Sequence, residues 1–206
     1  MGILIDLHLH TKRHSRCSSI DPHKLIRQAT KRGMTGLVIT EHHYQWPDEE
    51  LMELVDECDE PGFVLLAGFE YTSAQGDILI YGLKPTDVPA FVPGMSPEKA
   101  LQMAHERDGF CVAAHPTRAG LSFDERIFSL PLNAIEVRSV NLKEHEQRLA
   151  MGIAAHTKLP STASSDAHQL SDVGRYATEF DDPIQTMAHL HLALKRGRFR
   201  PANILP

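Results

Sequence analysis

The chain is poor in cysteine, and its three cysteines stand far apart. Cys17, Cys58 and Cys111 form no CxxC pair, and their odd number suits no disulfide framework. Small secreted domains held together by disulfides carry dense, usually even-numbered cysteines. The cysteine content therefore excludes a disulfide-built scaffold and predicts a protein of a reducing, cytoplasmic compartment.

Long apolar runs and repeats are missing as well. No segment is apolar over the length that a bilayer span requires, and the N-terminal region does not resemble a secretion signal. No repeat, low-complexity tract or linker divides the 206 residues, of which 42% are hydrophobic. We expect one domain over residues 1–206 with a substantial core and no membrane partner. The sequence leaves the oligomeric state open.

Positive charge and phosphate-binding glycine motifs are both scarce. The formal net charge of −6 argues against a protein that grips nucleic acid through its backbone phosphates. GxGxxG and GxxxxGK[ST] are absent, which disfavours a nucleotide-binding open sheet. A small anionic substrate remains compatible with this charge, because bound metal ions can reverse the field inside a cleft.

Apolar periodicity alternates between strand and helix patterns along the chain. It predicts strands at 2–9, 36–40, 63–70, 77–83, 110–115, 133–139 and, with a following loop, 160–168. Helices are predicted at 21–33, 47–60, 96–109, 142–158 and 181–197. The proline-rich stretch 84–97 is expected to be a loop, and the basic stretch 195–200 a solvated helix end. On the first strand, Ile3, Ile5, Leu7 and Leu9 are expected to share one face.

Strands that alternate with helices imply a mainly parallel sheet with helices outside it. The strand at 77–83 is expected to be a hairpin partner or neighbour of the strand before it. Six or seven such units fit this length, which falls short of the roughly 250 residues of a full (β/α)8 barrel. A compact barrel and an open doubly wound sheet are the two candidate α/β architectures.

Thirteen histidines are present beside one tryptophan, and several lie where predicted strands end. The polar residues at or near the carboxyl ends of predicted strands are Asp6, His8, His10, Glu41, His42, Glu70, His115, Glu136, Asp166 and His168. In barrels and α/β sheets the active site lies at this end. Histidines inside predicted helices are interpreted as surface or packing residues.

The residue types at the strand ends are those of a metal site. Residues two apart on a strand share a face, so Asp6, His8 and His10 are expected to project together. The HxH pair would bind metal, while Asp6 would orient a histidine ring. Histidine and carboxylate ligands without cysteine suit Zn, Mn or Fe. Structural alternatives remain open: His115 as an ordinary loop histidine, and Glu136 as an ion-pair partner of a nearby arginine.

Six segments resemble the polymerase and histidinol phosphatase (PHP) superfamily. They are DLHLHT (6–11), TEHH (40–43), GFE (68–70), AAHP (113–116), AIEV (134–137) and SSDAH (164–168), and their order matches from about residue 3 to 180. The resemblance implies an α/β fold, a compact distorted (β/α)7 barrel of PHP type. It also implies a cluster of two or three divalent metal ions and a phosphoesterase activity.

The resemblance also implies a distribution of ligands. One ion would be held by His8, His10, Glu70 and Asp166, a second by Glu70 and His115, and a third by His42 and His168. Members of the family usually place a histidine where this chain has QGD, so either Asp77 takes that role or the second metal binds more weakly. The loop KRHSRCSS (12–19) lacks an acid, and His14 lies slightly early to replace it, which favours two metals over three.

We therefore expect a metal-dependent phosphoesterase acting on a small phosphorylated substrate, with a phosphomonoester as the leading candidate. Catalytic roles are predicted for Asp166, His168 and Arg118; Arg118 would bind phosphate, unless it is an ordinary surface arginine. The sequence identifies no leaving-group acid, although His42, His168 or Asp77 would serve where they are not fully committed to metal. Two alternatives are an amidohydrolase-like enzyme cleaving a C–N bond, which the chain length and SDAH disfavour, and a non-catalytic metal-binding module.

Overall fold

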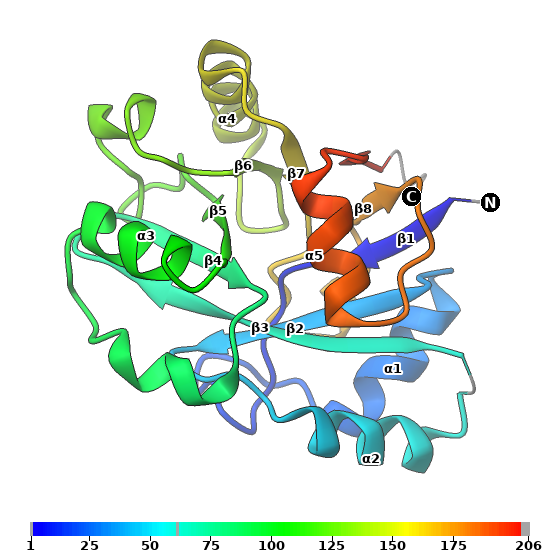
Figure 1. Ribbon diagram of the computed structural model, residues 1–206. Helices are drawn as coiled ribbons and strands as arrows, with labels where there is room; N and C mark the ends of the chain where they lie inside the picture. The colour runs from blue at the N-terminus through cyan, green and yellow to red at the C-terminus, as the bar shows by residue number, and fades with distance from the viewer. Residues whose placement is uncertain (1, 61, 203–206) are drawn as a thin grey trace.

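A computed structural model of the protein describes residues 2–60 and 62–202 (Figure 1). Within these residues, nine strands form one sheet in the order β7-β6-β5-β4-β3-β2-β1-β8-β9. The strands are β1 Ile3–Asp6, β2 Gly36–His42, β3 Val64–Thr72, β4 Asp77–Tyr81, β5 Phe110–Ala114, β6 Ala134–Arg138, β7 Ser161–Ala163, β8 Thr178–Phe180 and β9 Phe199–Pro201. The helices are α1 Pro22–Lys31, α2 Asp48–Cys58, α3 Pro97–His105, α4 Glu144–Thr157 and α5 Met187–Lys195.

Two strands of the sheet, β4 and β8, run antiparallel to both of their neighbours, and β4 is the one that bears on the strand ends. Strands β1, β2 and β3 pair in parallel, as do β5, β6 and β7, whereas β4 is antiparallel to both β3 and β5. The first residue of β4, Asp77, therefore pairs with Thr72 at the end of β3 and with Ala114 at the end of β5. This reversal brings Asp77 to the rim where the neighbouring strands end.

The sheet nearly closes on itself. The segment after β7 returns to the continuation of β1, where the Asp166 N–H donates to the His8 carbonyl (2.8 Å) and the His10 N–H to the Ala167 carbonyl (3.1 Å). Leu9 and Ala167 form a parallel bridge. The predicted α/β barrel is thus confirmed, and its near-closure gathers the strand ends at one rim.

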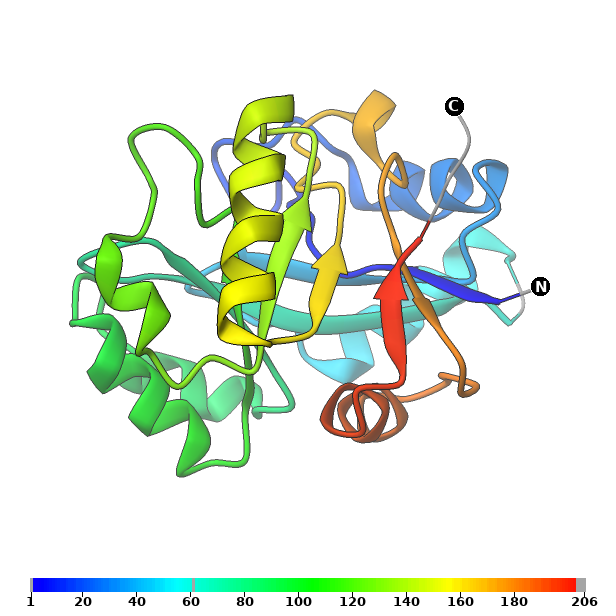
Figure 2. The same ribbon diagram turned by 90° about the horizontal axis from the view of Figure 1, so that it is seen from above.

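The helices lie outside the barrel, as Figures 1 and 2 show. Helices α1 and α2 pack against β2 and β3 through a cluster that includes Ile26, Leu54 and Ile39. Helices α3 and α4 cover another part of the sheet, with Leu101 and Ala150 in a second cluster. A third cluster joins α5 to strands including β1 and β5. None of the helices among the described residues has the length and apolar content needed to cross a bilayer.

Local chemistry explains the helix ends. Helix α1 begins with Pro22 after Asp21, whose carboxylate accepts the His23 N–H (3.1 Å). Proline suits the first helical position, and a capping aspartate satisfies one of the free N–H groups there. The helix ends before Gly33, which has a φ of 75°, a backbone conformation that glycine adopts readily. The stretch 84–97, predicted as a loop, contains a short 3-10 helix at Pro85–Ala90.

Two predictions for the terminal segments are wrong. Strand β1 ends at Asp6, and Leu9 packs in a different apolar cluster from Ile5 and Leu7, so these residues do not share one face. At the other end, the predicted helix 181–197 is shorter, and the basic stretch leads into β9. Phe199 of β9 is only 8% exposed and packs in the third cluster, which explains why this segment joins the sheet.

Candidate metal centre

Four buried side chains converge where β1, β3 and β7 end. The Nε2 atoms of His8 and His10 lie 3.2 Å apart. One oxygen of Glu70 lies 3.5 Å from His8 Nε2, and the other lies 3.2 Å from His10 Nε2. Asp166 Oδ1 lies 3.4 Å and 3.5 Å from the same two nitrogens. All four side chains are at most 1% exposed, so the group is enclosed by protein.

Further ligand-type atoms surround this group. His115 Nε2 lies 3.1 Å from Glu70 Oε1 and 3.9 Å from Asp77 Oδ2. On the more open side, the ring centroids of His42 and His168 lie 4.4 and 4.6 Å from that of His10.

The structure brings together all eight residues predicted as metal ligands, in four groups of three whose ligand atoms lie within 4.8 Å of one another. These groups are His10 with His42 and His168, His8 with His115 and Asp166, His8 with His10 and Glu70, and Glu70 with Asp77 and His115.

Some buried polar atoms at this rim have no hydrogen-bond partner among the described residues. Glu70 Oε2 and His42 Nδ1 lie 3.0 Å apart but, among the described residues, neither has a hydrogen-bond partner. Buried polar atoms without partners are costly unless an ion or water satisfies them. Nitrogen and carboxylate donors converging without cysteine fit Zn, Mn or Fe. The residues therefore fit a cluster of divalent ions.

The electrostatics of the site favour bound positive charge. Burial alone would raise the pKa of Glu70, but the adjacent His8, His10 and His115 rings hold it well below its usual value. Burial alone would lower the pKa of His10, but Asp166 and Glu70 raise it to about 9. The carboxylates thus retain their negative charge, and protons on the rings occupy the place that metal ions would take.

Glu136 supports the site from β6. Its Oε1 lies 3.1 Å from Nδ1 of His8, and its Oε2 accepts the His115 N–H (2.8 Å). A carboxylate on Nδ1 favours the proton there, so Nε2, which faces Glu70, is the ring nitrogen that would be available to a metal ion. Glu136 therefore contacts His8 rather than a nearby arginine, which was the alternative considered from sequence.

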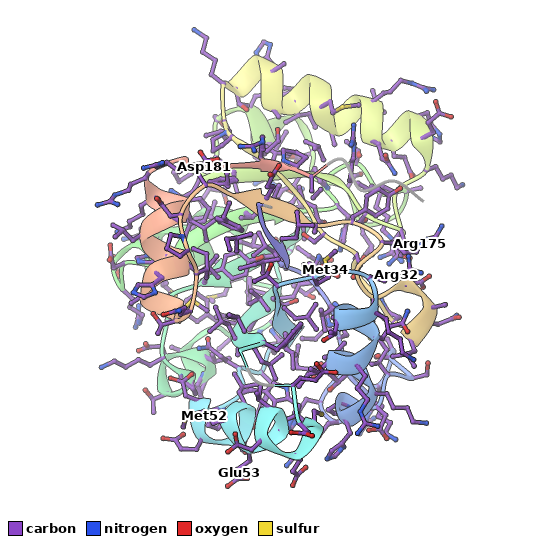
Figure 3. All side chains as sticks on the ribbon, turned by 90° about the vertical axis from the view of Figure 1, so that its right-hand side faces the viewer. Arg32, Met34, Met52, Glu53, Arg175 and Asp181 are labelled. Atoms are coloured by element: carbon purple, nitrogen blue, oxygen red, sulfur yellow. The ribbon has the colours of Figure 1, made fainter. Side chains whose placement is uncertain are left out.

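The role predicted for Asp6 is wrong. Its carboxylate accepts the backbone N–H groups of Ser165 (2.8 Å), Gly174 (3.1 Å) and His8 (3.4 Å), and among the described residues no histidine ring nitrogen is hydrogen-bonded to it. Gly174 has a φ of 70°, and a Cβ there would lie 3.1 Å from Met34. Met34 and Arg32, the two side chains that such a Cβ would meet, are labelled in Figure 3. Asp6 therefore holds the backbone of the segment after β7 and of His8, at the point where the regular strand ends, rather than a histidine ring.

A second carboxylate acts on His10 through a serine that sequence reasoning missed. Ser15 Oγ lies 2.5 Å from Glu41 Oε2 and 3.4 Å from His10 Nδ1, and it accepts the His42 N–H (3.2 Å). The single hydroxyl proton goes to Glu41, so His10 must carry its own proton on Nδ1. A serine in a polar loop carries no sequence signal for this role. His14 lies outside the four ligand groups and stacks on Tyr44, 3.8 Å between ring centroids.

Two further side chains lie close to the Oδ2 atom of Asp166. The guanidinium of Arg118 lies 3.7 Å from Asp166 Oδ2 and is one-third exposed. The amide of Asn141 donates to the same oxygen and to the Asp166 carbonyl, both at 2.8 Å. Arg118 is thus placed at the site as predicted from sequence, whereas Asn141 was missed.

Comparisons with known proteins identify a family for this chain. The family model for the PHP domain matches residues 6–112, and a model described as PHP-associated matches residues 144–199. An uncharacterized protein of Methanocaldococcus jannaschii is 29% identical over 143 residues, which cover 64% of this chain and 79% of that protein.

Solved structures share the fold at low identity. A two-domain Bacteroides vulgatus protein containing a predicted PHP-like metal-dependent phosphoesterase has a TM-score of 0.70 and 18% identity, covering 98% of this chain. The lesion-specific endonuclease PfuEndoQ from Pyrococcus furiosus has a TM-score of 0.71 and 18% identity, also covering 98%. This chain spans only 65% and 58% of those two proteins.

A Chromobacterium violaceum amidohydrolase with bound sulfate has a TM-score of 0.67 and 18% identity, covering 97% of this chain and 98% of that protein. Since the PHP-domain match alone covers more than half of the 206 residues and includes the HxH strand, the chain belongs to the PHP family.

Proposed function

We propose that this chain is a metal-dependent phosphoesterase that hydrolyses a small phosphorylated substrate, with a phosphomonoester as the leading candidate. The observation that carries the proposal is the buried convergence of His8, His10, Glu70 and Asp166 at one rim of the barrel. A cationic side chain, Arg118, lies beside the Asp166 carboxylate. At such a rim, bound metal ions and the Arg118 guanidinium would supply the positive charge and the hydrogen-bond donors that a phosphate group requires.

The metal ions would be held by the predicted ligands. His8, His10, Glu70 and Asp166 would bind one ion, and Glu70, Asp77 and His115 would bind a second. His42 and His168, whose rings lie beside that of His10, would bind a third. Bound divalent ions supply positive charge to phosphoryl oxygens and lower the pKa of a water that attacks phosphorus.

The protein's own side chains would orient the reactants. Glu136 and Ser15 fix the ring orientations of His8 and His10. The planar guanidinium of Arg118 matches two oxygens of a phosphate group. The departing alcohol needs a proton donor. His42 and His168, the partly exposed members of the ligand set, would serve where they are not committed to an ion, with Asp77 as the more buried alternative.

Two fold likenesses define the alternatives. The likeness to an endonuclease makes a phosphodiester a candidate substrate, and the likeness to an amidohydrolase keeps C–N bond hydrolysis as a second candidate function. A non-catalytic module would bind metal without turnover. That nucleic acid is not a tight partner stays a prediction from the net charge.

One experiment separates these possibilities. The purified protein is analysed for bound metal and assayed with Mn²⁺ on p-nitrophenyl phosphate, bis-p-nitrophenyl phosphate and a p-nitroanilide. We expect phosphate release from the monoester, lost in His8→Ala and Asp166→Ala. His23→Ala, which alters an exposed histidine on α1, is the matched control and should keep full activity. Retained activity in both site variants, or no metal bound by the native protein, would contradict the proposal.

A further inference from the structure

Arg118 lies in an exposed loop, yet its position is closely defined. The loop joins β5 to the 3-10 helix at Glu125–Phe128, and the Arg118 N–H donates to the His115 carbonyl (3.0 Å). Gly120, two residues later, has a φ of 84°. Arginine has many rotamers, and a loop of this kind would ordinarily leave its guanidinium mobile.

One buried residue of α4 holds both neighbours of Arg118. The Thr117 hydroxyl donates to the Glu146 carbonyl (2.7 Å), and the Ala119 N–H donates to Glu146 Oε1 (2.9 Å). The other carboxylate oxygen accepts the Lys143 N–H at the start of α4 (2.7 Å). Glu146 therefore links the loop after β5 to the helix after β6, with Arg118 between its two tethered residues.

Glu146 is suited to be a fixed anchor. Its side chain is only 4% exposed, and both carboxylate oxygens accept backbone N–H groups. These hydrogen bonds, from Lys143 and then Ala119, hold the pKa of Glu146 below its usual value, so it is an anion at neutral pH. An anchor of this kind removes freedom from the loop before any ligand binds.

The guanidinium of Arg118 still has donors available. Nη1 lies 3.7 Å from Asp166 Oδ2, and the side chain donates no hydrogen bond to any of the described residues. An arginine whose backbone is held on both sides, and whose unused donors lie beside a metal-type site, is a partly preorganised anion contact. The cost of ordering the loop backbone would then be met in folding rather than on binding.

We propose that Glu146 is a positioning residue that holds Arg118 where its free N–H groups meet the phosphate oxygens of a bound ligand. This inference rests on the proposed function only in naming phosphate as the anion. Its consequence is specific: loss of Glu146 weakens phosphate binding through Arg118 and leaves the chemistry of bound substrate largely unchanged.

The test uses the Mn²⁺-loaded full chain with two probes. Inorganic phosphate binding is measured by calorimetry, and p-nitrophenyl phosphate hydrolysis gives KM and kcat separately. We expect Glu146→Ala to raise the phosphate Kd and the KM by about three- to tenfold, the effect of one side chain losing its preorganisation. The kcat should change by less than about twofold, since the ions and their ligands are untouched.

Three further variants make the result specific. Arg118→Ala should weaken phosphate binding at least as much as Glu146→Ala, and the double variant should be no worse than Arg118→Ala. Glu146→Gln keeps one acceptor oxygen and should show part of the loss. Glu144→Ala is the matched control, because it removes an exposed acid from the same turn of α4, and its phosphate affinity should be unchanged.

Urea unfolding of every variant separates instability from misplacement. Additive losses in the double variant would overturn the proposal, as would a Glu146→Ala protein that loses stability but binds phosphate normally. A wild-type protein that binds phosphate but hydrolyses no ester would contradict the proposed function and leave the binding test decisive for Glu146. A wild-type protein that binds no phosphate would overturn the inference about Glu146.

Discussion

Glu136 Oε1 lies 3.1 Å from Nδ1 of His8, although 128 positions separate the two residues in the chain. The contact determines which ring nitrogen of His8 faces Glu70 and Asp166. Carboxylates that orient a metal-binding histidine in this way typically change metal affinity or activity by about 10- to 100-fold when mutated. The candidate metal centre therefore depends on a residue that contributes no ligand atom of its own.

Glu136→Gln is expected to weaken Mn²⁺ binding by about tenfold, the lower end of that range, because glutamine still accepts the ring proton but lacks the charge. Competition with a fluorescent chelator measures the affinity. Glu98→Gln, at an exposed glutamate of α3, serves as the control and should bind Mn²⁺ normally. Equal affinity in Glu136→Gln and the wild type would show that the contact does not support the site.

Two glycines should respond to alanine in opposite directions. A Cβ at Gly68 of β3 would lie 2.7 Å from the Ile80 carbonyl oxygen and 2.8 Å from the Tyr81 ring. Gly68→Ala should lower the free energy of unfolding by about 1–3 kcal/mol, because the neighbouring strand must shift. At Gly152, inside α4, a Cβ would have no heavy atom within 4 Å, so Gly152→Ala should raise the free energy of unfolding by about 0.5–1 kcal/mol. Urea unfolding measures both, and changes of the same sign would contradict the packing described.

The Asp21 cap should stabilise the protein in a pH-dependent way. A hydrogen bond from Lys12 lowers the pKa of Asp21 to about 2, and its carboxylate also accepts the His23 N–H. Asp21→Ala should cost about 1 kcal/mol at pH 7, typical of a lost helix cap. A depressed pKa in the folded state gives stability that is complete above the unfolded value of about 3.9 and is lost as the pH falls toward 2.

The difference in urea unfolding free energy between the wild type and Asp21→Ala should therefore shrink when measured at pH 3 instead of pH 7. Asp59→Ala, just after α2, is the comparison outside a helix start. A difference that grows as the pH falls would contradict the assignment of the charged cap.

Much of the candidate site could be predicted because strand ends are readable from sequence. Apolar runs that end in His10, His42, Glu70 and His115 are local signals, and the barrel topology brings such ends to one rim. Asp77 was harder to place, since its position depends on β4 running antiparallel, and residues 77–83 alone do not determine that direction.

The parts that sequence could not provide are contacts between distant segments. Ser15 and Asn141 are ordinary polar loop residues, and only the fold brings them to His10 and Asp166. The role of Asp6 was misassigned because the alternation of β1 ends there, which no residue in the strand signals. Strand β9 was missed because three residues after a basic helix end carry too weak a pattern.

Removal of metal should lower both stability and activity. Ions that bind the folded chain but not the unfolded one raise its stability in proportion to the logarithm of their concentration over the dissociation constant. Chelator treatment is therefore expected to lower the thermal unfolding midpoint of the wild type. The same treatment should have little effect on His8→Ala, and an equal fall in both proteins would indicate that the ions bind elsewhere.

The most direct measurement is a Mn²⁺ titration of the chelator-treated protein that follows phosphate release from p-nitrophenyl phosphate. Phosphate release should be absent without added metal, return as Mn²⁺ is added, and saturate at two or three ions per chain. No recovery is expected in Asp166→Ala at any Mn²⁺ concentration. Full phosphate release by the metal-free wild type, or equal recovery in Asp166→Ala, would contradict the proposed function.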